Sequence, residues 1–211
     1  MFRLFTLSMG DLKQKIAISE EDSLRADMYG FLAELLRAEP QSKLLKSVAS
    51  LSGDESALGK SISTLSHLAA QIDTNSVRAE YVNLFIGVGR GELLPYGSYY
   101  LTGFLNEKPL AKLREDMRIM GIARADGVKE PEDHIASLFD MMSGLICGTF
   151  GREYSLKEQS KFFNKHIEPW AGLFFSDLEK AKTAVFYGPV GSIGKEFVEI
   201  EAEGFNMSGL E

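Results

Sequence analysis

The segment Glu130-Pro131-Glu132-Asp133-His134 holds the densest group of reactive side chains in the sequence. Acidic residues in the first turn of a helix are stabilised by the positive end of the helix dipole. Proline fits the same turn, because its missing N–H costs nothing there. The segment therefore predicts a helix start with Pro131 in the first turn. Capping explains His134 less easily, because the dipole disfavours its cationic form, although the neighbouring carboxylates oppose that effect.

An Asp–His pair could orient a nucleophile in a catalytic triad. Adjacent residues of a helix point about 100° apart, which places Asp133 and His134 poorly for direct pairing. The sequence also contains no Gly-x-Ser-x-Gly elbow of the hydrolase type. A polar pocket wall that hydrogen-bonds a peptide suits these residues better than catalysis. An enzyme that uses Asp133 and His134 as acid and base stays as an alternative and requires a deep pocket.

Aromatic residues supply a second group of candidates. Tyr81, Leu84 and Phe85 are spaced three and four residues apart, which places them on one helical face. Ordinary core packing explains that spacing equally well. Three further tyrosines follow Pro95, and tyrosine is common where peptides dock because it joins apolar area to a polar tip. The alternative for these tyrosines, Tyr96, Tyr99 and Tyr100, is a cluster at the edge of the core.

Several other kinds of site are disfavoured. Residues 87–91 are rich in glycine, but a phosphate-binding loop needs a preceding strand and a following Lys-Ser/Thr, and here Glu92 follows. The three histidines and Cys147 match no recognised zinc spacing. Cys147 has apolar neighbours and is expected to be a buried core thiol. We expect no cofactor and no metal on these grounds.

The overall charge and hydropathy narrow the class of protein. The 211 residues carry a formal net charge of -7, which disfavours nucleic-acid binding and favours a basic partner. No apolar run reaches the roughly 18 residues that span a bilayer. The first nine residues lack the features of a signal peptide. We therefore expect a cytoplasmic protein without stable membrane insertion.

These candidate residues must be positioned by helices, because the hydrophobic spacing is helical nearly throughout. Predicted helix starts are Ser19 with its acidic neighbours, Asp54, Asn75 and the capping box Ser155–Glu158. The expected fold is all-α, a single compact bundle of about eight or nine helices over residues 19–211. Residues 1–18 form an unanchored segment, and the tail after about 189 carries only a weak helix near 192–203. The predicted helices fall at about 19–39, 44–51, 54–72, 75–87, 110–120, 131–146, 155–166, 169–178 and 192–203.

An ordered set of short motifs resembles the TorD/DmsD/NarJ family of redox-enzyme maturation chaperones. The resemblance covers about residues 22–184. Its pieces are a first helix at 25–33, an aromatic-x-x-Leu-Phe signature at 80–85, a Pro-aromatic-x-Ser loop at 94–98, the segment 130–135 and a His-x-x-Pro-Trp element at 166–170. Each piece is weak alone, whereas the ordered set is specific.

This resemblance implies an all-helical fold and a function that is not enzymatic. Members bind the twin-arginine signal peptide, or the apo form, of a molybdenum-cofactor oxidoreductase subunit and delay its export until the cofactor is inserted. Some exchange helices in domain-swapped dimers, so a monomer or such a dimer is expected. Some also bind guanine nucleotide, although no phosphate loop supports this here. The implied peptide-binding residues are Tyr81, Leu84, Phe85, Tyr100, Pro131, Asp133 and His134.

Two positions depart from the family pattern. Tyr81 stands where tryptophan is frequent, and Gly97 stands where glutamate is frequent. Both changes bear on which peptide the pocket prefers. Two other functions stay open: a maturation chaperone for a redox enzyme that is not exported, which recognises the body of its client, and a generic helical adaptor. The leading hypothesis places Asp133 and His134 on one wall of a peptide groove, opposite Tyr81, Leu84 and Phe85.

Overall fold

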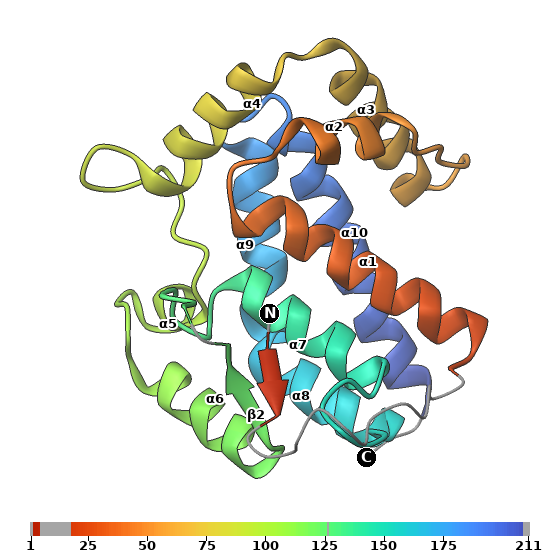
Figure 1. The fold of residues 1–211 in the computed structure, drawn as a ribbon, viewed down its shortest axis with the longest axis vertical. Coiled ribbons are helices and arrows are strands. Elements are labelled where there is room, and N and C mark those ends of the chain that lie inside the picture. Colours follow the sequence, from red (N-terminus) through yellow and green to blue (C-terminus); the bar gives the residue numbers. More distant parts are fainter. Residues whose placement is uncertain (1, 5–17, 126, 209–211) are drawn as a thin grey trace. The chain divides into compact units, whose positions relative to one another are not determined.

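The computed structural model describes residues 2–4, 18–125 and 127–208, and these residues are mainly helical (Figure 1). Ten α-helices and one short π-helix occur within them, which confirms the predicted all-α class. The helices are α1 Glu20–Arg37, α2 Ser42–Ala49, α3 Ala57–Gln71, α4 Thr74–Tyr81, the π-helix η1 Val82–Ile86, α5 Gly97–Thr102, α6 Lys108–Ile119, α7 Ile135–Ile146, α8 Leu156–His166, α9 Glu168–Lys180 and α10 Tyr187–Met207.

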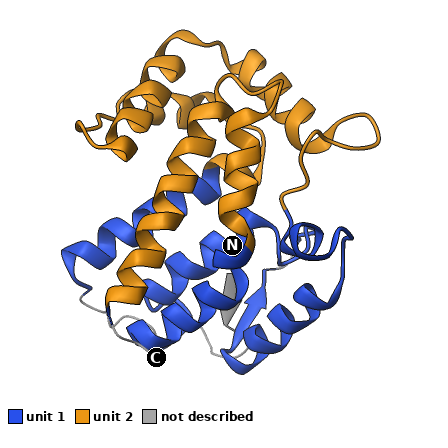
Figure 2. Cartoon of the chain, turned by 180° about the vertical axis from the view of Figure 1, so that it is seen from behind, with its two compact units in different colours: residues 1–34, 96–169, 208–211 blue, residues 35–95, 170–207 orange. Residues whose placement is uncertain are grey.

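The described chain divides into two compact units, coloured separately in Figure 2. Unit 1 comprises the described parts of residues 1–34, 96–169 and 208–211. Unit 2 comprises residues 35–95 and 170–207. The extent of the predicted domain, 19–211, stays a prediction. Most of the predicted unanchored segment, residues 5–17, lies outside the described residues.

Unit 1 is built around α7, whose side chains are buried on nearly all sides. α8 packs against α7, and α6 packs against α5. The Tyr29 ring of α1 meets the Phe139 ring edge to face, with centroids 5.1 Å apart. A three-residue strand, β1 Phe2–Leu4, pairs antiparallel with β2 Ile122–Arg124. The sequence indicated no sheet, because three residues are too few to show an alternating pattern.

Unit 2 joins α2, α3, α4, η1 and most of α9 and α10, and α3 packs against both α2 and α10. Glycines let α9 and α10 approach closely. A Cβ at Gly191 would lie 2.4 Å from the backbone N of Glu179, and one at Gly194 would lie 2.2 Å from the Phe175 ring. α10 is much longer than the predicted 192–203, because close packing outweighs the low helix propensity of its glycines.

Local capping explains where several helices begin. Ser19 caps α1 by accepting from Asp22 N at 3.0 Å, and Ser155 forms the predicted capping box with Glu158. The predicted starts at Asp54 and Asn75 are wrong by two residues each. Ser56 caps α3 and Asp73 caps α4, and in each pair the two residues compete as equally good cap types.

Candidate functional site

Residues 131–134 form a turn before α7, not the first turn of the helix. α7 begins only at Ile135, so the prediction for Pro131 is wrong. The reason is that His134 pairs its backbone with Tyr96 in an isolated antiparallel bridge, which holds the segment extended. The Gly97 N–H also donates to Asp133 O at 2.9 Å. Pro131 is half-buried in this turn.

Asp133 is 3% exposed and joins the turn to α5. Its Oδ2 accepts the Ser98 N–H at 2.7 Å, so the carboxylate caps the start of α5. The other oxygen, Oδ1, and the hydroxyl of Ser98 find no hydrogen-bond partner among the described residues. Each buried polar atom without a partner calls for an explanation.

His134 is the N-cap of α7, so capping explains this residue more directly than the sequence suggested. Its Nδ1 accepts the Ala136 N–H at 3.1 Å, which places the proton of a neutral ring on Nε2. The side chain is 6% exposed, and its ring meets Tyr96 edge to face at 5.1 Å. Asp133 and His134 thus bond to different backbone groups.

The other two acids of the segment differ in availability. Glu132 is 7% exposed and lies 2.8 Å from Arg114 Nη2 and 3.9 Å from Arg124 Nε. It is therefore already paired within the protein. Glu130 is exposed and accepts the Tyr96 hydroxyl. Of the two, Glu130 is the carboxylate that faces solvent.

Tyr100 lies in α5 and is half-buried. Its ring meets that of Tyr99 edge to face, with centroids 5.9 Å apart. Beyond them, Leu101, Phe104 and Leu105 are exposed, by 43%, 69% and 43%. The tyrosines therefore lie at the edge of the core, beside an apolar surface that the sequence analysis did not identify.

Tyr81, Leu84 and Phe85 lie in unit 2, where α4 passes into the π-helix η1. Leu84 is fully buried and Tyr81 is 6% exposed, so both are core residues. Phe85 is half-buried. The rings of Tyr81, Phe85 and Tyr187 cluster with centroids 5.0 to 6.0 Å apart. Short π-helical turns are frequent at functional sites, which keeps this segment a candidate.

A returning loop holds the π turn in place. Glu92 N donates to Asn83 O at 3.1 Å, and Leu93 N donates to Leu84 O at 2.8 Å. Gly87 has φ +60°, and a Cβ at Gly91 would lie 2.6 Å from Leu84 O. The glycines of residues 87–91 therefore serve a tight helix-to-helix connection, with a helical turn before them where a phosphate loop has a strand.

Glu80, next to the aromatic group, is a buried anchor that sequence reasoning missed. It is 7% exposed, and its carboxylate accepts the N–H groups of Val185, Phe186 and Tyr187 at 2.8, 3.0 and 2.7 Å. These donors lie at the start of α10, so Glu80 caps that helix from another element. Its only signal in the sequence was its position beside Tyr81 in the family motif.

The late motif histidine, His166, forms a charge cluster in unit 1. His166 Nε2 lies 2.6 Å from Asp116 Oδ2, and Lys165 Nζ lies 2.5 Å from the same oxygen. Burial lowers the pKa of His166, and the hydrogen bond that His166 donates to Asp116 opposes that shift. Burial acts to raise the pKa of Asp116, but hydrogen bonds from Lys165 and His166 outweigh it and lower that pKa overall. The carboxylate is thus held ionised.

Two other sequence expectations concern cysteine and metal. Cys147 is half-buried at the end of α7, where burial raises the pKa of its thiol. It is therefore a poor nucleophile, although less buried than expected. Among residues 2–4, 18–125 and 127–208, no cluster of three His, Cys, Asp or Glu side chains is arranged to hold a metal ion.

No helix in this described part has the length and apolarity needed to cross a membrane.

The seven predicted peptide-binding residues therefore fall into two groups. One lies in unit 2, in and beside η1, and the other lies in unit 1, on α5 and the turn before α7. That the groups form opposite walls of one groove stays a prediction. The unit 1 group contains Tyr100, Pro131, Asp133 and His134, and the unit 2 group contains Tyr81, Leu84 and Phe85.

A known protein shares the helical fold of this chain. A structure from Archaeoglobus fulgidus, described as a redox enzyme maturation protein, superposes with a TM-score of 0.60 at 18% identity, covering 89% of this chain and 99% of that one. This likeness shows a shared fold.

Sequence comparison identifies the family. The model of the nitrate reductase delta subunit family matches residues 52–176, and the chain belongs to this family. Chaperone protein TorD of Vibrio cholerae is 26% identical over 208 residues, covering 89% of this chain and 94% of the relative. Chaperone protein TorD of Aliivibrio fischeri is 27% identical over 203 residues, covering 85% and 93%. The predicted resemblance to this family is confirmed.

Proposed function

We propose that this protein is a cytoplasmic chaperone for a molybdenum-cofactor oxidoreductase subunit. It binds the twin-arginine signal peptide or the apo form of that subunit and holds it until the cofactor is inserted. Membership of the family and relatives named as chaperones over nearly their whole length support this role. The same names support a protein without catalytic activity. Because the client is bound before its export, this chaperone acts in the cytoplasm.

The main support for a peptide site comes from two buried polar atoms, Asp133 Oδ1 and Ser98 Oγ. Neither atom has a hydrogen-bond partner among the described residues. A buried carboxylate oxygen without a partner costs roughly 1–3 kcal/mol or more. A guanidinium or peptide N–H that reaches this buried oxygen, which requires the turn to open, recovers this free energy. Charge-assisted bonds of this kind are about twice as strong as neutral ones. The Asp133 turn therefore favours an arginine-bearing peptide over a neutral one.

The acidic residues that can meet the peptide are fewer than the sequence suggested. Glu132 is already paired with Arg114, whereas Glu130 is exposed. For the apolar part of a signal peptide, Phe85 is half-buried and Ile86 is 52% exposed, so these two offer accessible area. Tyr81 and Leu84 support that surface from the core.

The experiment is calorimetric titration with a synthetic peptide that has an Arg-Arg motif and an apolar tail. Wild-type protein is expected to bind reversibly with an affinity in the micromolar class, about -8 kcal/mol. Alanine at Asp133 and His134 removes two helix caps, so a loss of binding there would be confounded by lost stability. Asp133→Asn and His134→Asn keep an oxygen that can cap and remove the charge or the ring.

Asp133→Asn is expected to weaken binding about tenfold or more, the loss of one charged hydrogen bond. The matched control is Glu115→Gln, an equal loss of charge on an exposed residue of α6 outside the turn. Equal affinity of Asp133→Asn and wild type removes the turn from the site. Binding only to a mature enzyme domain favours recognition of the client body, and binding to neither favours an adaptor. Titration with guanine nucleotide tests whether the protein binds it, and size-exclusion chromatography tests whether the protein is a monomer or a dimer.

A further inference from the structure

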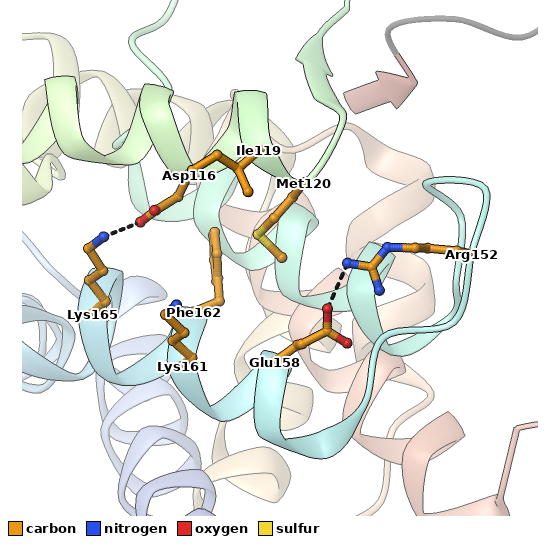
Figure 3. A pocket seen from close by; sticks show the side chains of 8 residues that line it. All are labelled: Asp116, Ile119, Met120, Arg152, Glu158, Lys161, Phe162 and Lys165. Atoms are coloured by element: carbon orange, nitrogen blue, oxygen red, sulfur yellow. Dashed lines mark hydrogen bonds and ion pairs between the residues drawn. The ribbon is translucent and has the colours of Figure 1, made fainter. Parts of the chain in front are cut away.

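A pocket of about 160 Å³ opens in unit 1 between α6 and α8 (Figure 3). It lies outside the turn at Glu130–His134 and outside the aromatic group at η1. α6 and the residue after it supply one side, α8 supplies the other, and the loop before α8 supplies Arg152. The lining residues are Asp116, Ile119, Met120, Arg152, Glu158, Lys161, Phe162 and Lys165.

The floor of the pocket is apolar. Phe162 is 3% exposed and forms its base, with Met120 beside it. Ile119 also lines the pocket and is 68% exposed. An apolar cavity of about 150 Å³ holds one benzene, whereas pockets for whole small molecules span roughly 300–1,000 Å³. The size therefore suits one large side chain inserted from a polypeptide.

The rim carries an excess of positive charge. Arg152 lies 2.7 Å from Glu158, and Lys165 lies 2.5 Å from Asp116, so both carboxylates are paired (Figure 3). Lys161 projects from α8 between these pairs, and no carboxylate of the described residues pairs with it. Three cations therefore face two carboxylates, on a chain whose formal net charge is -7. The rim thus complements an anion placed beside an apolar group.

We propose that this pocket binds a partner polypeptide segment in which a phenylalanine or leucine stands next to an acidic residue. The apolar side chain packs on Phe162, Met120 and Ile119, and the carboxylate meets Lys161. A twin-arginine signal peptide has the opposite charge and does not fit this rim. The pocket is thus a second docking point, independent of the signal-peptide site, for an acidic and apolar segment.

The test uses amide chemical shifts of ¹⁵N-labelled full-length protein, titrated with an acetylated, amidated peptide Gly-Phe-Asp-Gly. Shifts are expected at α6 and α8, saturating in the millimolar range because one side chain and one surface charge are engaged. Peptides with Asn in place of Asp, or Ala in place of Phe, are expected to bind at least about threefold more weakly.

Two variants separate the charge from the floor. Lys161 is exposed. Lys161→Glu is expected to weaken binding about fivefold or more, since its attraction for the peptide's carboxylate becomes repulsion. Ile119→Ser removes exposed apolar area and is expected to weaken it similarly. The matched control is Lys157→Glu, the same change of charge on the same helix at a residue that does not line the pocket. It is expected to change the affinity less than twofold.

Equal binding of the Asp and Asn peptides, or wild-type affinity in Lys161→Glu, overturns the proposal. So do shifts confined to other elements, or binding of phenylacetate but not of the peptide. Shifts at α6 and α8 that depend on protein concentration alone would assign the pocket to a second copy and also overturn it. An Arg-Arg peptide titrated into Lys161→Glu is expected to bind as to wild type. That arm distinguishes failure here from failure of the proposed chaperone function.

Discussion

Replacing Glu80 by glutamine is expected to destabilise the protein strongly, although Glu80 touches no candidate ligand. Its Oε1 accepts from Val185 N and Tyr187 N, and its Oε2 accepts from Phe186 N. In glutamine one oxygen can keep the first two bonds. The amide NH₂ then faces the third N–H, donor against donor.

The expected loss follows from these bonds. Leaving a buried donor unsatisfied costs roughly 1–3 kcal/mol, and two charged bonds become neutral and weaken by a further fraction of a kcal/mol each. Together these terms give about 2–3 kcal/mol of unfolding free energy. In a chain of this length about 3 °C is lost per kcal/mol, so the melting temperature is expected to fall by about 6–9 °C.

Urea unfolding followed by circular dichroism measures this loss. The control is Glu92→Gln. The exposed carboxylate of Glu92 also binds the segment between α9 and α10, where it accepts from Lys182 N, Thr183 N and Thr183 Oγ1. Water replaces those bonds, so that change is expected to cost less than about 1 kcal/mol. Equal losses from both variants, or no loss from Glu80→Gln, would refute the argument that burial of the carboxylate makes the cap essential.

Three further outcomes are expected. His134→Ala loses the N-cap of α7 and about 0.5–2 kcal/mol in thermal melts, whereas His134→Asn loses only a fraction of that. The hydrogen bond from Arg152 is the largest cause that lowers the pKa of Glu158 to about 2, so Arg152→Ala is expected to move that pKa toward 4.5 in an NMR titration. Burial lowers the pKa of His166, opposed by Asp116, so the unfolded chain binds the proton first. Stability is therefore expected to fall as pH drops below 6.5 toward the lowered folded pKa, and His166→Gln is expected to flatten that slope.

The helical class could be predicted because apolar residues recur at helical spacing along most of the chain. Starts such as Ser155 could be predicted because a capping box is a local signal. The start of α7 could not, since the bridge between Tyr96 and His134 joins residues far apart in sequence. Local rules therefore favoured Pro131 in a first turn that does not form.

The candidate site was predictable only in part, because its contacts also join residues far apart in the sequence. The family motif indicated Asp133 and His134, yet the sequence does not show that Asp133 caps α5 or that its second oxygen lacks a partner. Glu132 seemed available until the structure paired it with Arg114. The sequence around Glu80 did not indicate its capping role, because its three donors lie more than 100 residues away.

The central claim is that this chain recognises an arginine-bearing export signal. Calorimetric titration of the wild-type protein compares a peptide containing Arg-Arg with one in which both arginines are glutamine and the apolar tail is unchanged. We expect micromolar binding of the first and at least tenfold weaker binding of the second, because Asp133 and Glu130 select for charge. Equal binding of the two peptides, or binding of neither, would contradict the account.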